Sequence, residues 1–158
     1  MKHILFVCTG NIFRSMIAEY ALRQAAGADA AYAFASAGTE AKAQEMDGLV
    51  RQLLERRGVD PSAHRQRRLT PEIFAAADLV VAIGLDHAEY IKEHHGHEAP
   101  LFNQVARGER RPILDTWEAV PDYADNAPAR RAHIRRVADH IFDAAPGFLA
   151  GLARLACT

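Results

Sequence analysis

The fold of this chain is decided near its start by the stretch Phe6-Val7-Cys8-Thr9-Gly10-Asn11-Ile12-Phe13-Arg14-Ser15. The apolar run before the cysteine, at residues 3–7, predicts a buried strand. Residues 16–23 carry apolar side chains at helical spacing and predict a helix. Cys8 therefore stands where a strand ends, and Arg14 stands where a helix begins. The backbone N–H groups of the loop between them, together with the helix dipole, make a binding site for an anion.

Each residue type in this loop suits the binding and transfer of a phosphoryl group. Positive potential at the helix start favours the thiolate of Cys8, which is the nucleophilic form. The planar guanidinium of Arg14 matches two phosphate oxygens, and Ser15 can donate a hydrogen bond to the sulfur. We expect Gly10 to supply the positive φ of a tight loop and Asn11 to bond nearby backbone groups. The alternative is a cysteine that only packs in the core.

Length and composition suit a single domain over residues 1–158, because a chain of 158 residues can bury a real core. A formal net charge of −1 gives no indication of a nucleic-acid or membrane partner. The two cysteines, Cys8 and Cys157, form neither a disulfide framework nor a zinc pattern. An activated thiol needs a reducing compartment, and the N-terminal apolar run is too short for a signal sequence or a membrane span. We therefore expect a cytoplasmic protein.

The rest of the chain alternates between strand and helix patterns. Strands are expected at residues 30–35, 77–83 and 99–102, and helices at 49–57, from Pro71 onward, at 86–95 and at 127–153, the last kinked or split at Pro146-Gly147. This alternation predicts a doubly wound parallel sheet. Ligands of such sheets bind at the carboxyl ends of the strands, where Ser36-Ala37-Gly38-Thr39 would lie near Cys8.

Two further clusters of polar residues could carry chemistry. The basic segment, defined as residues 64–68 (His64-Arg65-Gln66-Arg67-Arg68), is expected to be a solvated edge in preference to a substrate-binding patch. Four histidines, His87, His94, His95 and His97, lie close together in the sequence. They lack cysteines and suitably placed carboxylates, so we expect no metal site.

The loop from Cys8 to Ser15, directly after the first strand, resembles the phosphate loop of the low-molecular-weight protein tyrosine phosphatase family. Ser36-Ala37-Gly38-Thr39 and Val120-Pro121-Asp122 are similar to two further segments of that family, the second being its acid loop. The resemblance extends over nearly the whole chain. It implies a flavodoxin-like α/β fold, with a four-stranded parallel sheet and helices on both faces. It also implies hydrolysis of phosphomonoesters, above all protein phosphotyrosine, without a metal or another cofactor.

The same resemblance implies a role for each site residue. Cys8 is the nucleophile that forms a phosphocysteine, Arg14 binds the phosphoryl oxygens, and Asp122 is the general acid and base. The phosphate is expected to bind at Thr9, Gly10, Asn11, Ile12, Phe13, Arg14 and Ser15. The partners are then a phosphotyrosine protein or a small phosphomonoester, with inorganic phosphate as product and inhibitor. Asp115, Glu118 and Asp125 lie in the same acidic loop and remain rivals of Asp122.

Two alternative functions remain open because the chain departs from the family pattern. The family usually has a second cysteine in the loop, where this chain has Phe13, and its aromatic residues after the acid are reduced to Tyr123. An arsenate reductase of the related thioredoxin-coupled type would need further cysteines, and only Cys157 is available. A catalytically weak phosphate-binding regulatory module is the second alternative, because a fold and a loop do not establish turnover.

Overall fold

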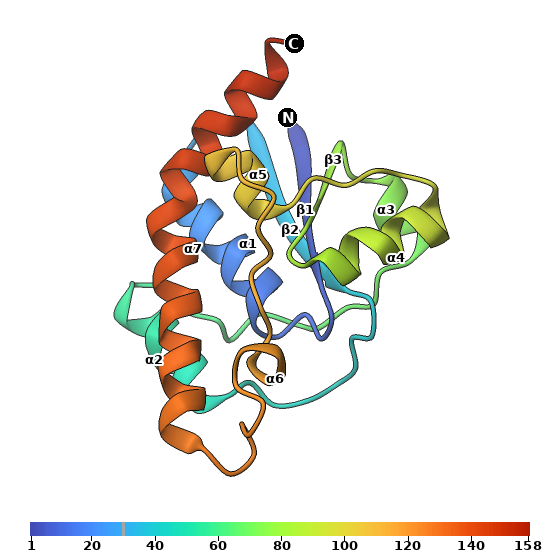
Figure 1. Ribbon diagram of the computed structural model, residues 1–158. Helices are drawn as coiled ribbons and strands as arrows, with labels where there is room; N and C mark the ends of the chain where they lie inside the picture. Colours follow the sequence, from blue (N-terminus) through green and yellow to red (C-terminus); the bar gives the residue numbers. More distant parts are fainter. Residues whose placement is uncertain (30) are drawn as a thin grey trace.

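A computed structural model describes residues 1–29 and 31–158 and shows an α/β fold (Figure 1). Its sheet is formed by the parallel strands β1 (Lys2–Cys8), β2 (Tyr32–Gly38) and β3 (Leu79–Ala82), in the order β2-β1-β3. The predicted α/β class with a parallel sheet is thereby confirmed. The strand expected at 30–35 begins at Ala30, which lies outside the described residues, and β2 continues three residues beyond that prediction.

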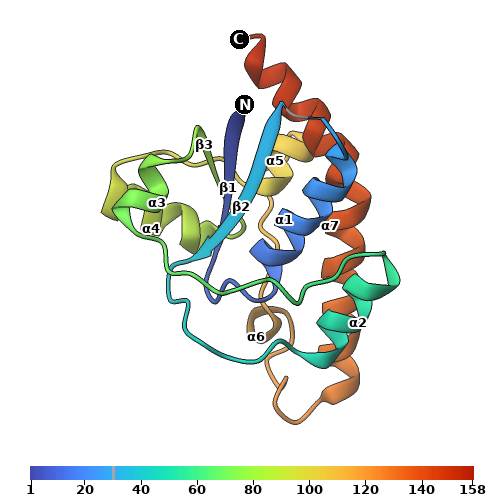
Figure 2. The same cartoon turned by 180° about the vertical axis from the view of Figure 1, so that it is seen from behind.

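Helices cover both faces of the sheet, as Figures 1 and 2 show. They are α1 (Arg14–Ala26), α2 (Gly48–Arg56), α3 (Pro71–Ala75), α4 (Leu85–His95), α5 (Phe102–Arg107), α6 (Thr116–Ala119) and α7 (Ala127–Ala156). Side chains of β1 alternate between the two faces, as a strand requires. Ile4 and Phe6 pack into the larger core with α1, α5 and α7, while Leu5 and Val7 pack into the smaller core with α4.

The four-stranded sheet is not confirmed, because the segment at 99–102 does not form a strand among the described residues. Leu101 makes a single parallel bridge with Ala82, and α5 begins at the next residue. Pro100 has no N–H group to donate to a ladder. The N–H of Leu101 donates instead to Oε1 of Gln104 at 2.8 Å, as the start of α5. Neither residue 100 nor residue 101 can therefore donate a backbone N–H to the sheet, and the segment lies at the sheet edge without extending it.

Helix α7 runs from Ala127 to Ala156 without a break, although it contains Pro146. Of the predicted kink or split at this proline, the split is therefore wrong. Packing stabilises the helix there, since a Cβ at Gly151 would overlap the carbonyl oxygen of Val105 in α5. Such close contact between two helices outweighs the loss of one backbone hydrogen bond. Within the described ranges, no helix combines the length and the apolar composition needed to cross a membrane.

The carboxyl ends of the strands meet at one end of the molecule, in the lower half of Figure 1. The loop after β1, the loop after β2 and helix α6 gather there, whereas both chain termini lie at the opposite end (Figure 1). In the register of the sheet, Cys8 is opposite Gly38. A Cβ on Gly38 would overlap the carbonyl oxygen of Thr9, so only glycine allows this approach. The predicted neighbourhood of Ser36–Thr39 and Cys8 is thus observed.

Candidate active site

The sulfur of Cys8 lies at the centre of a buried hydrogen-bond network. Its Sγ is 2.8 Å from Oγ of Ser15, and both residues are buried. The side-chain amide of Asn11 donates to Oγ of Ser15 at 3.1 Å and to Oγ of Ser36 at 2.7 Å. Because the Ser15 oxygen accepts from Asn11, its own O–H is available to the sulfur. A hydroxyl that donates to sulfur stabilises the thiolate over the thiol.

A buried carboxylate sets the direction of this network. The Ser36 hydroxyl donates to Oε1 of Glu19 at 2.8 Å, and Glu19 in turn lies 3.1 Å from a guanidinium nitrogen of Arg23. A hydroxyl that donates to a carboxylate has only its lone pairs left for the Asn11 amide, which fixes the orientation of that amide. Glu19 is therefore a positioning residue. This role was not predicted from the sequence, although a glutamate on the buried side of α1 was a signal for it.

The left-handed residue of the loop is Asn11, with φ of 54°, and not Gly10 as predicted. Two contacts hold this conformation in addition to those of its amide nitrogen. Nε2 of His64 donates to the Asn11 carbonyl at 2.7 Å, and the N–H of Arg67 donates to Oδ1 of Asn11 at 3.0 Å. A Cβ at Gly10 would lie 3.3 Å from Nε2 of Gln44. That atom is the end of an exposed, flexible side chain, so this contact alone does not require glycine at position 10.

The backbone N–H groups of the loop are available for a ligand. Taking residues 1–29 and 31–158 together, no protein atom accepts a hydrogen bond from the N–H groups of residues 10–14. Helix α1 begins at Arg14 and adds the positive end of its dipole at the same place. Unpartnered donors at a helix start, next to a buried sulfur, suit an anion with several oxygens. This arrangement supports the expected phosphate site at residues 9–15.

The guanidinium of Arg14 is buried and bridges the loop to the acidic segment 113–125. It is 2% exposed, and its NH1 group donates to the Ile113 carbonyl at 2.9 Å. Its NH2 group donates to Oδ2 of Asp115 at 3.1 Å, and Glu118 lies 3.9 Å from NH1. Asp115 also caps α6, accepting from the N–H of Thr116. The structure thus brings Arg14 and Asp115 together, although they are far apart in the chain.

Asp122 lies elsewhere in the acidic segment. Its side chain is exposed and accepts a hydrogen bond from the Asn126 amide at 3.1 Å, just before α7. Asp125 is also exposed. Of the four acidic residues considered, Asp115 and Glu118 have a nitrogen of Arg14 within 4 Å in the described part of the chain. Asp122 remains a prediction from the family resemblance.

His87 contacts the loop, a role that the sequence analysis did not assign to it. Nδ1 of the ring accepts from the N–H of Gly84 at 2.9 Å, so the ring proton is on Nε2, which donates to Oγ1 of Thr9 at 2.8 Å. Burial, and to a smaller extent the charge of Arg14, lowers the pKa of His87 from 6.5 to about 4. His87 is therefore neutral at physiological pH and holds Thr9 by a neutral hydrogen bond.

This burial of His87 predicts an acid-dependent loss of stability. The folded-state pKa is below the unfolded value, so the contribution is fully present above about pH 6.5 and is lost as the pH falls through about 4. The shift corresponds to about 3 kcal/mol at most. In His87→Gln, the fall in the free energy of unfolding between pH 7 and pH 4.5 should be smaller by about 2 kcal/mol, measured by urea unfolding. The exposed His94→Gln is the control, and equal pH dependence of the two variants would contradict this account.

The other histidines do not gather into a metal site. His94 stacks on Tyr90 and His95 stacks on Phe74, with ring centroids 3.9 and 4.4 Å apart. Across the residues that the structure describes, no three His, Cys, Asp or Glu side chains are arranged to hold a metal ion. These rings therefore have ordinary packing partners.

A pocket of about 250 Å³ opens beside the loop. Ile12 and Phe13 of the loop line it on one side, and Asp115 and Tyr123 of the acidic segment line it on another. The remaining lining residues are Gln44, Glu45, Asp47, Val50, Thr116, Arg130 and Ile134. Two aromatic rings and three aliphatic side chains give this pocket the apolar walls that a flat ring requires.

Comparisons with known proteins agree with this geometry. A sequence model of the family described as low molecular weight phosphotyrosine protein phosphatase matches residues 3–155. The chain is 32% identical over 100 residues to the low molecular weight protein-tyrosine-phosphatase Ptp of Acinetobacter johnsonii, a match that covers 58% of this chain and 63% of that protein. It is 34% identical over 118 residues to the probable low molecular weight protein-tyrosine-phosphatase EpsP of Ralstonia solanacearum, covering 74% of this chain and 79% of that protein.

A solved structure supports the same fold. The YwlE arginine phosphatase from Geobacillus stearothermophilus has a TM-score of 0.80 and 24% identity, and the match covers 98% of this chain and 94% of that one. This similarity bears on the fold alone. The family match, by contrast, extends along nearly the whole sequence and includes the phosphate loop and the acidic segment. The chain belongs to the low molecular weight phosphotyrosine protein phosphatase family.

Proposed function

We propose that this protein hydrolyses phosphate monoesters of tyrosine side chains in proteins, with Cys8 as the nucleophile. The observation that carries this proposal is the loop itself, in which a buried sulfur accompanies the unpartnered N–H groups of residues 10–14 and the guanidinium of Arg14. Such a loop can bind three phosphoryl oxygens while the sulfur faces the phosphorus. The free thiol supports a cytoplasmic location, where reducing conditions preserve it.

The reaction balances in two steps. The thiolate of Cys8 attacks phosphorus, the P–S bond forms, and the P–O bond to the tyrosine breaks as a carboxyl group gives its proton to the leaving oxygen. A water molecule then attacks the phosphocysteine, the same carboxylate takes the proton from the water, and the P–S bond breaks. Arg14 and the loop N–H groups stabilise the negative charge on the three oxygens in both steps.

We further propose that Asp115, in preference to Asp122, is the proton donor. Oδ2 of Asp115 contacts Arg14 at 3.1 Å, and Asp115 lines the pocket beside the loop. When a phosphoryl group binds, its oxygens compete with Asp115 for the Arg14 guanidinium, which leaves the carboxyl group next to the bound ester. Asp122 supports the alternative only through its similarity to the family's acid loop, because it is exposed and bonded to Asn126.

Phosphotyrosine is the substrate that the pocket favours. Phe13 and Tyr123 provide apolar walls for a ring above the phosphate loop. Phosphoarginine is a second candidate, because the carboxylates of Glu45 and Asp47 also line this pocket and could accept a guanidinium. An arsenate reductase relay is less well supported, since Cys157 is exposed near the C-terminus, at the opposite end of the molecule from the loop (Figure 1).

A substrate panel tests this proposal. Peptides of one sequence carrying phosphotyrosine, phosphoserine or phosphoarginine should differ in kcat/KM by at least about 100-fold in favour of phosphotyrosine, because only its ring fills the apolar walls. Inorganic phosphate and vanadate should inhibit competitively. Preference for phosphoarginine would overturn the substrate assignment, and absence of phosphate release from all three peptides would favour a regulatory module. Arsenate turnover in the wild type that is lost in Cys157→Ser would instead favour the reductase.

A further inference from the structure

We propose that a second pocket next to the phosphate loop binds an acidic side chain of the substrate peptide, and that Arg65 is the residue that recognises it. This inference rests on the proposed phosphotyrosine phosphatase activity and names a determinant of its specificity. The second pocket has a volume of about 430 Å³. Its lining consists of Gln44, Glu45, Met46, Arg51, Pro61, Ser62, His64, Arg65 and Gln66.

The second pocket adjoins the catalytic loop through two structural links. Gln44 and Glu45 line both this pocket and the pocket at the loop, so the two share a wall. His64 lines the second pocket and donates to the Asn11 carbonyl of the loop at 2.7 Å. An extended peptide advances about 3.3 Å per residue, so a side chain about two or three residues from the phosphotyrosine can reach across this wall.

Arg65 is held in a form suited to a carboxylate. Its NH1 group donates to the carbonyls of Ser62 at 3.0 Å and of His64 at 2.8 Å, which fixes the guanidinium at the pocket wall. In the described part of the chain, Nε and NH2 of Arg65 have no protein acceptor. This edge of the guanidinium presents two parallel N–H groups, the arrangement that binds a carboxylate or a phosphate by two hydrogen bonds.

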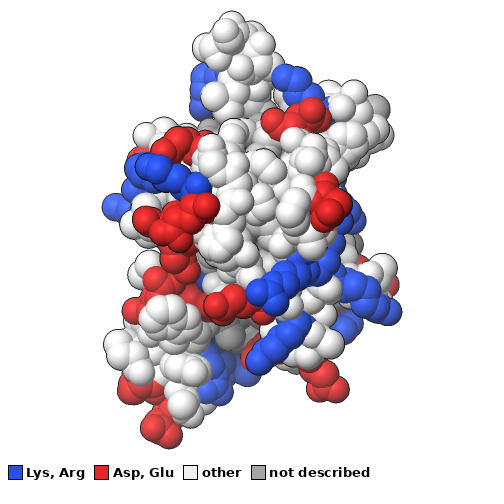
Figure 3. All heavy atoms as spheres, turned by 90° about the vertical axis from the view of Figure 1, so that its right-hand side faces the viewer, with Lys and Arg blue, Asp and Glu red and all other residues white. Residues whose placement is uncertain are grey.

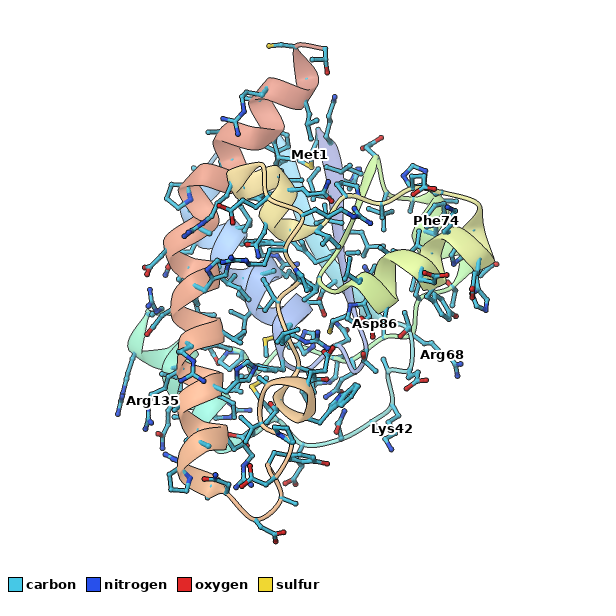
Figure 4. The ribbon with its side chains drawn as sticks, viewed as in Figure 1. Met1, Lys42, Arg68, Phe74, Asp86 and Arg135 are labelled. Atoms are coloured by element: carbon cyan, nitrogen blue, oxygen red, sulfur yellow. The ribbon has the colours of Figure 1, made fainter. Side chains whose placement is uncertain are left out.

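The electrostatic surroundings favour an anion at this position. Within residues 1–29 and 31–158, no carboxylate lies within 4 Å of Arg65, Arg67 or Arg68, whereas Arg14 has two and Arg23, Arg51 and Arg57 have one each. Arg68, which bridges to Gly38 at the end of β2, and Lys42 lie outside the lining of the second pocket, on the right-hand side of Figure 4. Figure 3, which faces the right-hand side of Figure 1, shows Lys and Arg side chains in its lower half interspersed with Asp and Glu.

The negative charge of Glu45 and the partial pairing of Arg51 weaken the attraction of an acidic side chain to the second pocket. Glu45 lines the pocket, and Arg51 lies 3.8 Å from Glu55. Arg65 is therefore the cation that distinguishes this pocket. The contact is exposed to solvent, so we expect a modest gain of about three- to fivefold in kcat/KM, which should decrease at high salt.

A peptide scan tests the proposal. In a phosphotyrosine peptide with alanines at the flanking positions, one glutamate is moved through each position from four before to four after the phosphotyrosine. A glutamate at one or two neighbouring positions on one side should raise kcat/KM about three- to fivefold over glutamine at the same place. Phosphoserine at the best position shows whether a phosphate is taken in preference to a carboxylate. The gain should disappear in Arg65→Ala and persist in Arg135→Ala, which removes an exposed positive charge from α7, away from the loop (Figure 4).

p-Nitrophenyl phosphate has no peptide to fill the second pocket. Its turnover should therefore be the same in the wild type, Arg65→Ala and Arg135→Ala. That result would also show that Arg65→Ala is folded. Equal rates for glutamate, phosphoserine and glutamine at every position would overturn the subsite while leaving the phosphatase activity intact. Equal loss in Arg65→Ala and Arg135→Ala would also overturn it, in favour of general charge attraction. Absence of turnover of any phosphotyrosine peptide by the wild type would overturn the proposed function itself, and the subsite with it.

Discussion

Replacing Cys8 with serine should lower kcat for p-nitrophenyl phosphate by at least about 10⁴-fold. A serine hydroxyl is a far weaker nucleophile than a thiolate at neutral pH, and the loop contains no general base that would activate it. The network around the sulfur stabilises an anion through the Ser15 hydroxyl, which is 2.8 Å away, and it accepts no proton in this arrangement.

The affinity of Cys8→Ser for inorganic phosphate distinguishes the loss of the nucleophile from damage to the structure of the loop. Cys8→Ser keeps the unpartnered N–H groups of residues 10–14 and the Arg14 guanidinium, so its affinity for inorganic phosphate should change by less than about threefold. Isothermal titration calorimetry measures that affinity. A variant that retained more than about one hundredth of the wild-type kcat would exclude Cys8 as the nucleophile.

The second large effect concerns the proton donor. Asp115→Asn should lower kcat for phosphotyrosine by about 10²- to 10⁴-fold, because the phenolic oxygen needs a proton as it leaves. For p-nitrophenyl phosphate, whose leaving group needs little protonation, the loss in the first step should be about tenfold or less. Asp122→Asn should change both rates by less than about twofold, since its exposed carboxylate contacts Asn126 and not the loop.

Asp115 also contacts Arg14 and caps α6, so a structural effect of its replacement must be recognised. Damage of that kind would raise KM and the inhibition constant of phosphate for both substrates to a similar extent. A fall in kcat/KM, which reports the first step, that is largest for the poor leaving group and leaves the inhibition constant of phosphate unchanged identifies the acid. If Asp122→Asn shows this pattern and Asp115→Asn does not, the family resemblance located the proton donor correctly and the contact with Arg14 has another purpose.

Local features of the sequence predicted the parts of the fold that depend on local physics. The strand that ends at Cys8 and the helix that begins at Arg14 are neighbours in the chain, and hydrophobic periodicity was sufficient to place both. The prediction of a fourth strand was not confirmed, because the apolar pattern at 99–102 does not show whether the backbone of residues 100 and 101 can donate hydrogen bonds to the sheet. Pro100 has no N–H group, and that of Leu101 caps α5.

The site was harder to predict where its contacts join distant parts of the chain. The bond between Thr9 and His87 spans 78 residues, and that between Arg14 and Asp115 spans 101. Among the four acidic residues of one loop, Asp122 was preferred only through the family resemblance, because the sequence does not reveal which of them faces the guanidinium. Even within the loop, the residue with positive φ was Asn11 instead of Gly10, because contacts from residues 64 and 67 compensate its strain.

The most direct test of the central claim is detection of phosphate on the Cys8 sulfur during turnover. In Asp115→Asn with p-nitrophenyl phosphate, the first step needs little acid while the second lacks its base, so the intermediate should accumulate. Rapid acid quenching followed by peptide mass spectrometry should find close to one phosphate per protein, on Cys8. Steady turnover by a protein whose Cys8 never carries phosphate, or phosphate on another residue, would contradict the account.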